Sequence, residues 1–204
     1  TASIQKSMRT SSIDEVGDTS HLTFFEMLGN FSFGGYWKKE AIQYAYEFIT
    51  KEMGLKIDHV SIFGGENNAP GDQESEQIWK SVDPLLEVKK LGFEDNFWGP
   101  TGDKGPCGPS TEIYVNGIEV WNVVFNEFYC DNSRENILSG IAKLTSLKTN
   151  GIDTGMGIER LAMVVQEKKN IFETDLFNKP MELLPFELSE HDKRVIIDHV
   201  RASI

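Results

Sequence analysis

The sequence predicts an α+β protein, with an antiparallel β-sheet flanked by helices. Strand-like segments of aromatic and β-branched residues occur in neighbouring pairs, and an Asn116-Gly117 turn joins the clearest pair. Helical segments stand between these pairs rather than alternating with single strands, which disfavours a doubly wound parallel sheet. Thirteen phenylalanines and 39% hydrophobic residues can also fill a substantial core.

The first third of the chain predicts two strands, a helix and a further strand. Apolar and polar residues alternate over 3–9, and a polar loop at 10–21 leads to a second strand-like run at 22–35. Residues 37–54 form the clearest helix, because an apolar stripe runs from Ile42 to Met53 and Gly54 can end it. A short strand at 59–63 and a short helix at 74–82 follow.

Glycine and proline are frequent in residues 93–110, which predicts a stretch without regular structure. A stretch of this length inside a domain is usually functional or disordered, and its aromatic residues argue against disorder. Strands are expected at 111–115 and 117–130, and a polar connection at 131–140.

Residues 151–160, GIDTGMGIER, predict a strand-to-helix turn that combines glycines with Asp153 and Arg160. Glycine lets the backbone approach a ligand closely, and the two opposite charges suit a small molecule with an ammonium and a phosphate. Arg160 either clamps a phosphate or pairs on the surface with Glu159 or Glu167. A last helix is expected from Ser189, with Asp192 completing its capping pattern.

Charge and cysteine content limit the possible partners. The formal net charge of −12 excludes a broad basic surface, so non-specific capture of nucleic acid is not expected. Cys107 and Cys130 are too few for a disulfide framework or a structural zinc site, so we expect reduced thiols, no zinc and a cytoplasmic protein. Cys107 is interpreted as structural. No signal peptide or membrane span is expected.

Four ordered stretches resemble the catalytic core of the alanyl-tRNA synthetases, a class II aminoacyl-tRNA synthetase family. They are HLTFFEMLGNFSFGGYW, DNFWGPTGDKGPCGPSTEI, VWNVVFNEF and GIDTGMGIERLAMVV. The resemblance implies a class II catalytic domain over residues 1–188 and the start of a helical tRNA-recognition region over 189–204. Nothing here corresponds to the family's motif 1, and the loop at 10–22 lacks the basic residues often found there.

The resemblance also implies residues for ATP. Arg9 is expected to hold the α-phosphate, His21 to lie near the outer phosphates and Phe25 to stack on adenine. Phe24 competes with Phe25, because a strand presents only one of the two to a given side. Arg160 is expected at the γ-phosphate and on the other side of adenine.

For the amino acid, the resemblance implies Asp153 as the acid for the ammonium, with Gly155 leaving room beside it. Trp98 and Val124 are expected to wall a methyl-sized cavity, although without the resemblance both would be interpreted as core. Asn122 and Glu112 are polar residues in apolar strands. Both could contact the substrate, and Glu112 could also contact Mg²⁺. Alternatively, both act as hydrogen-bonding struts.

The implied function is ATP-dependent activation of L-alanine and its transfer to tRNA(Ala), with Mg²⁺. Contact with tRNA is expected mostly through regions outside this sequence, and a partner chain could supply missing parts. The alternative is a fragment or paralogue that binds nucleotide or a partner subunit without aminoacylating.

Overall fold

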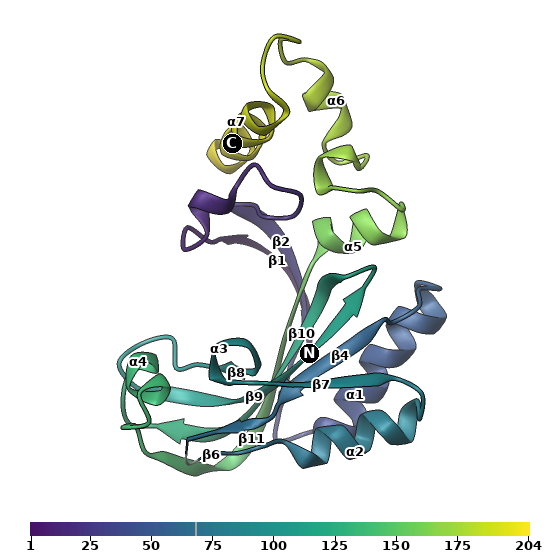
Figure 1. Ribbon diagram of the computed structural model, residues 1–204. Coiled ribbons are helices and arrows are strands. Elements are labelled where there is room, and N and C mark those ends of the chain that lie inside the picture. The colour runs from purple at the N-terminus through teal and green to yellow at the C-terminus, as the bar shows by residue number, and fades with distance from the viewer. Residues whose placement is uncertain (68) are drawn as a thin grey trace. The chain divides into compact units, whose positions relative to one another are not determined.

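The computed structural model describes residues 1–67 and 69–204, and these residues confirm the predicted α+β fold (Figure 1). The chain forms two compact units. Unit 1 contains Thr1–Ala2 and Gly29–Gly155, and unit 2 contains Ser3–Leu28 and Met156–Ile204. The expected domain boundary between residues 188 and 189 coincides with no limit of either unit and stays a prediction.

Unit 1 is built on a mainly antiparallel sheet in the order β11-β10-β9-β4-β7. In this strand order, β4 and β7 pair in parallel, and β11 with β10, β10 with β9 and β9 with β4 pair antiparallel. Asn116 and Gly117 join β9 to β10 with φ angles of 52° and 75°, as a tight hairpin turn requires. The strands are β3 (Ser32–Phe33), β4 (His59–Phe63), β7 (Glu87–Leu91), β8 (Phe97–Trp98), β9 (Gly105–Val115), β10 (Ile118–Cys130) and β11 (Leu144–Gly157). A small hairpin adds β5 (Gly65–Glu66) and β6 (Ala69–Pro70).

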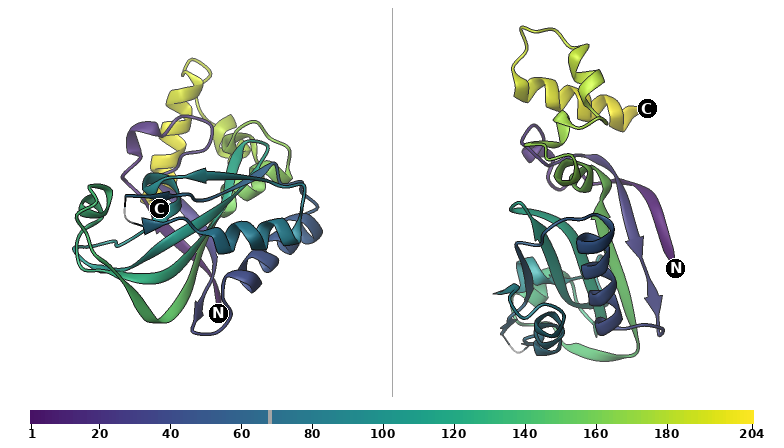
Figure 2. Two further views of the ribbon diagram at one scale, coloured as in Figure 1. Left: turned by 60° about the horizontal axis from the view of Figure 1, so that its bottom comes forward. Right: turned by 90° about the vertical axis from the view of Figure 1, so that its right-hand side faces the viewer.

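Two helices, α1 (Lys38–Glu47) and α2 (Gln73–Val82), lie on the same side of this sheet (Figure 2). The indole of Trp37, at the start of α1, packs edge-on against Phe125 of β10. Trp79 of α2 is buried and donates a hydrogen bond to the hydroxyl of Thr111 on β9. Because side chains alternate along a strand, the neighbours of Phe125 and Thr111 point to the opposite face.

Residues 93–110 contradict the predicted lack of regular structure. They contain α3 (Phe93–Asn96), β8 and the start of β9, and β8 pairs with β9 at Gly108 and Pro109. The polar connection expected at 131–140 also contains a short helix, α4 (Arg134–Leu138). In both places the local composition disfavours regular structure, and pairing or packing with distant residues stabilises it instead.

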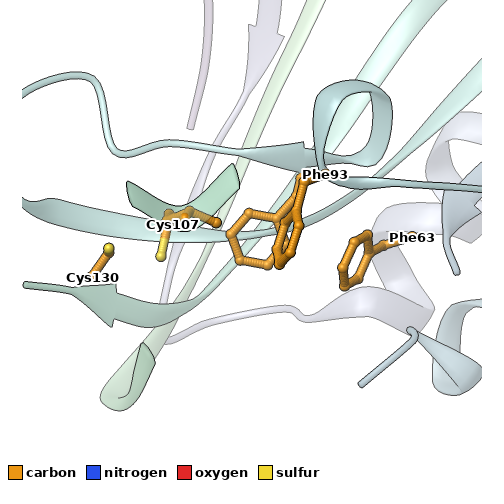
Figure 3. Packing of buried hydrophobic residues seen from close by; sticks show 6 residues of the cluster. Phe63, Phe93, Cys107 and Cys130 are labelled. Atoms are coloured by element: carbon orange, nitrogen blue, oxygen red, sulfur yellow. The ribbon is translucent and has the colours of Figure 1, made fainter. Parts of the chain in front are cut away.

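A buried cluster next to this region contains Phe63, Phe93, Phe97 and the two cysteines (Figure 3). Figure 3 shows Cys107 and Cys130 beside each other on neighbouring strands. Both thiols are free and fully buried, and burial raises the pKa of Cys107 to about 12. A thiol with so high a pKa is a poor nucleophile, which agrees with a structural role for Cys107.

Unit 2 contains a three-stranded arrangement and three helices. Strand β2 (Phe24–Asn30) lies between β1 (Ala2–Met8) and the end of β11, where Met156 pairs with Leu28. The helices are α5 (Ile158–Val165), α6 (Asn178–Glu182) and α7 (Glu190–Ser203), with 3-10 turns at Ile13–Glu15 and Ile171–Glu173. The hydroxyl of Ser189 accepts a hydrogen bond from the Asp192 amide, which confirms the predicted cap of α7.

The glycine-rich segment before α5 is a strand and not the predicted turn. Residues 151–157 belong to β11, and the helix begins directly at Ile158. Asp153 and Gly155 are therefore strand residues with fixed cross-strand neighbours. Among the described residues, no helix has both the length and the apolar character needed to cross a membrane.

Candidate functional site

One face of the sheet in unit 1 collects most of the residues expected around the amino acid. On β10, Asn122 lies opposite Glu112 of β9 and Gly155 of β11. Two residues further along, Val124 lies opposite Ser110 and Asp153. Directly opposite residues of antiparallel strands point to the same side, so these two rows share a face. It is the face opposite Phe125 and Thr111.

Asp153 places a carboxyl group on this face, and it has no compensating partner in the part of the chain that the structure describes. Its side chain has no hydrogen bond or ion pair within residues 1–67 and 69–204. Burial is the cause that raises the pKa of its carboxyl group. A half-buried carboxylate in this state is well suited to receive a cationic group of a ligand, since the ligand would supply the missing counter-charge.

Glu112 is surrounded by hydrogen-bond donors. Its Oε2 accepts from the hydroxyls of Tyr114 at 2.8 Å and Ser61 at 3.0 Å, and its Oε1 accepts from the amide nitrogen of Asn122 at 3.2 Å. Burial, followed by the nearby charge of Glu119, raises the pKa of Glu112 to about 7. The Oδ1 atom of Asn122 is buried without a partner among the described residues.

The expected aromatic wall, Trp98, lies on β8 opposite Gly108 of β9. Gly108 precedes Ser110 by two residues, so Trp98 lies near the end of the strand segment that contains Ser110. Val124 is 5% exposed, whereas Trp98 keeps 37% of its surface exposed. An indole that is this accessible can still cover a small ligand.

Unit 2 contains the residues expected around ATP, and it separates the two competing phenylalanines. The guanidinium of Arg9 lies over the ring of Phe25, 5.6 Å from its centroid. Phe24 has a different neighbour, since the guanidinium of Arg201 lies 5.0 Å from its ring centroid. With Phe24 packed against Arg201 of α7, Phe25 is the ring that shares a side of β2 with Arg9.

His21 lies between two carboxylates in the loop before β2. Its Nδ1 is 2.6 Å from Asp18 and its Nε2 is 2.9 Å from Glu15. Both ring nitrogens are therefore engaged by acids in this structure. A contact between His21 and a phosphate would require the ring to leave at least one of them.

Arg160 lies in the first turn of α5, next to a buried acid. That acid, Glu159, forms an ion pair with Arg201 at 2.6 Å and accepts the backbone N–H of Glu26. Asp198 of α7 similarly accepts the backbone N–H of Thr23 at 2.8 Å. Helix α7 thus supports the start of β2, the strand that contains Phe25, directly through Asp198 and indirectly through the ion pair of Arg201 with Glu159 of α5.

Sequence reasoning missed several of these supporting residues. Ser61 and Tyr114 donate hydrogen bonds to Glu112, Asp198 accepts one from Thr23 directly before β2, and Arg201 donates one to Phe24 of β2. Ser61 could have been noticed as the polar centre of an otherwise apolar strand, HVSIF. Nothing in the local sequence indicates the contacts of α7 with β2, because about 175 residues separate the two.

Sequence comparison identifies the class to which this arrangement belongs. A family model described as "tRNA synthetases class II (A)" matches residues 1–204. The chain therefore belongs to this family of class II tRNA synthetases.

Within this family, the chain is similar to individual alanine–tRNA ligases. The chain is 40% identical over 238 residues to an alanine–tRNA ligase of Rubrobacter xylanophilus, covering 98% of this chain and 26% of that protein. It is 38% identical over 232 residues to the alanine–tRNA ligase of Treponema denticola, covering 98% of this chain and 37% of the relative. These matches confirm the resemblance to the alanyl-tRNA synthetase catalytic core. The chain spans about a quarter to two fifths of the length of these relatives.

Among solved structures, the chain is similar to a pyrrolysyl-tRNA synthetase of Desulfitobacterium hafniense. The TM-score is 0.45 at 10% identity, over 85% of this chain and 44% of that chain. A likeness at this level supports no argument about the site.

Class II synthetases generally use ATP with Mg²⁺, which makes the surroundings of Glu112 important. In the described part of the chain, no three His, Cys, Asp or Glu side chains gather as a metal site would require. Both oxygens of Glu112 already accept hydrogen bonds from protein donors. The carboxylate of Glu112, held by protein hydrogen-bond donors and without further acidic ligands beside it in the described residues, therefore does not fit a Mg²⁺ site.

Proposed function

We propose that the protein activates L-alanine with ATP to form alanyl-adenylate and pyrophosphate, and then transfers the alanyl group to tRNA(Ala). The observation that supports this proposal best is the half-buried Asp153 without a partner among the described residues, on the same sheet face as Val124. A carboxylate and a small apolar wall on one face match an α-ammonium and a methyl group. The family membership supplies ATP and tRNA as the other substrates.

In the proposed first step, a carboxylate oxygen of alanine attacks the α-phosphorus of ATP. The new bond joins that oxygen to phosphorus, and the bond from phosphorus to the bridging oxygen breaks and releases pyrophosphate. No covalent enzyme intermediate is needed, so catalysis consists of positioning and charge stabilisation. Arg9 would hold the α-phosphate, Phe25 the adenine and Arg160 the γ-phosphate.

Mg²⁺, when bound with ATP, would neutralise charge on the triphosphate. The second step would pass the alanyl group to the terminal ribose of tRNA(Ala). The acidic net charge of −12 offers no broad surface for that polynucleotide, so we assign most tRNA contacts to regions outside these residues. We place the reaction in the cytoplasm, in keeping with two buried free thiols.

Alanine-dependent exchange of labelled pyrophosphate into ATP tests the proposal. We expect exchange by the unaltered protein and its loss in Asp153→Ala, because the ammonium would lose its counter-charge. Glu182→Ala is the matched control, since Glu182 is an exposed carboxylate of α6 and belongs to no proposed site. A folded protein that binds a non-hydrolysable alanyl-adenylate mimic without exchange would select the non-catalytic alternative.

A further inference from the structure

Glu112 occupies the centre of a row of side chains that crosses four strands. In register, Ser61 of β4, Glu112 of β9, Asn122 of β10 and Gly155 of β11 follow one another. The next row on the same face contains Asp153, the residue to which the proposed function assigns the alanine ammonium. Glu112 is thus one strand away from Asn122 and two strands away from the strand of Asp153.

The hydrogen bonds of Glu112 fix the orientation of Asn122. The amide nitrogen of Asn122 donates to Oε1 of Glu112, so its Oδ1 must point away from that carboxylate. On the other side, the hydroxyls of Ser61 and Tyr114 hold Oε2 and prevent the carboxylate from turning. Glu112 is only 8% exposed, and Ser61 is fully buried.

Within the described residues, this orientation leaves Oδ1 of Asn122 buried and without a hydrogen-bond partner. Buried acceptors of this kind are uncommon in folded proteins, and a bound ligand is one way of satisfying them. An α-ammonium has three N–H donors, one for Asp153 and a further one for Asn122. Gly155, opposite Asn122, adds no side chain at this position.

We propose that Glu112 is a positioning residue for the amino-acid substrate, which holds the Asn122 carboxamide with Oδ1 presented to the ammonium, and that it is not a Mg²⁺ ligand. This inference rests on the proposed function. It replaces the metal role that the sequence suggested for Glu112 with the strut role that the sequence left open.

The test compares two substitutions of similar size in the pyrophosphate exchange assay. Glu112→Gln keeps an acceptor for Asn122, whereas Glu112→Met removes it. We expect E112Q to keep a KM for alanine close to that of the unaltered protein. We expect E112M to raise that KM roughly tenfold, as loss of one charge-assisted hydrogen bond would. In both variants the KM for ATP and the Mg²⁺ dependence should stay unchanged.

A double variant separates positioning from a direct role. If Glu112 acts through Asn122, then E112M combined with Asn122→Ala should be no worse for alanine than N122A alone. Additive losses would overturn the proposal, and so would an unchanged alanine KM in E112M. If E112M does not fold, E112Q still distinguishes a Mg²⁺ ligand from a positioning residue. Loss of a metal ligand would shift the Mg²⁺ requirement of E112Q, whereas loss of a positioning carboxylate would leave it unchanged.

The same assay distinguishes the two proposals. Absence of exchange by the unaltered, folded protein overturns the proposed function and this inference with it. Exchange by the unaltered protein, together with a raised Mg²⁺ requirement in E112Q, overturns only the inference.

Discussion

The binding role proposed for Asp153 would come at the expense of stability. Its carboxyl group is half-buried, has no partner among the described residues and has a pKa raised by burial. A raised pKa means that the folded state binds the proton more tightly than the unfolded chain does. The resulting penalty is absent below the unfolded pKa, grows as the pH rises from the unfolded to the folded pKa, and is complete above the folded pKa.

This sign gives a prediction for Asp153→Asn. The variant should unfold at a temperature no lower than that of the unaltered protein at neutral pH, while its alanine-dependent exchange is largely lost. Thermal unfolding followed by circular dichroism, beside the exchange assay, checks both parts. A clearly lower melting temperature would mean that Asp153 has a stabilising partner in the folded protein.

The pH dependence of alanine binding follows from the same carboxyl group. Only its ionised form attracts the ammonium, so the KM for alanine should rise as the pH falls through the raised pKa of Asp153. This rise should begin at a higher pH than the titration of an exposed aspartate. Steady-state kinetics at a series of acidic pH values would show it, with the KM for ATP as the internal reference. A flat alanine KM over that range would contradict the assignment.

At the scale of elements, strand β9 shows what local sequence can and cannot predict. The hairpin at Asn116 and Gly117, the helix at α2 and the cap at Ser189 follow from local chemistry, and all three were predictable. The strand pairing of Gly105 to Pro109 was not, because glycine and proline disfavour strands and the partners lie on β8 and β10. The turn expected at 151–160 is wrong for the same reason, since cross-strand pairing keeps residues 151–157 extended up to the helix at Ile158.

Gly108 is the position in β9 where a side chain is least tolerable. A Cβ atom there would lie 1.9 Å from the carbonyl oxygen of Phe125 on β10. That oxygen is backbone, so the strands would have to separate. Gly108→Ala should therefore lower the free energy of unfolding by about 1–3 kcal/mol or more. It should also weaken alanine binding, because Trp98 lies opposite Gly108.

Gly102→Ala is the matched control for this prediction. Nothing lies within 4 Å of a Cβ built at Gly102, and its backbone is not in the left-handed region. Denaturant unfolding of both variants should show a loss for G108A and almost none for G102A. Equal stabilities would mean that β9 and β10 can separate here without cost.

At the scale of the whole molecule, the expected residues divide between the two units. Trp98, Asn122, Val124 and Asp153 belong to unit 1, whereas the residues expected around ATP belong to unit 2. Their identities were predictable from the resemblance, because four long motifs occur in order. Some of their supports were not, since Ser61 contacts Glu112 in unit 1 and Arg201 contacts Glu159 in unit 2 across at least 40 intervening residues.

The proposed alanine pocket also limits the accuracy of the whole reaction. A pocket for a methyl group loses only about 1–3 kcal/mol of transition-state binding when glycine replaces alanine, and it rejects an added hydroxyl roughly a hundredfold at most. In this chain, Oγ of Ser110 is buried opposite Val124 and has no partner among the described residues. A serine hydroxyl would therefore meet a hydrogen-bonding group near the methyl site.

We therefore expect glycine and serine to support measurable pyrophosphate exchange. Their kcat/KM values should lie below that of alanine, roughly 10- to 200-fold for glycine and at most roughly a hundredfold for serine. Ser110→Ala should lower the kcat/KM for serine several-fold, because the hydroxyl of the substrate serine would lose its hydrogen-bond partner. The kcat/KM values for alanine and glycine should stay nearly unchanged, because neither has a hydroxyl. Exchange rates with the three amino acids, in the unaltered protein and in S110A, measure this directly. Undetectable serine-dependent exchange would contradict the pocket, whereas an equal loss for all three amino acids would mean that Ser110 supports the strand and does not contact the substrate.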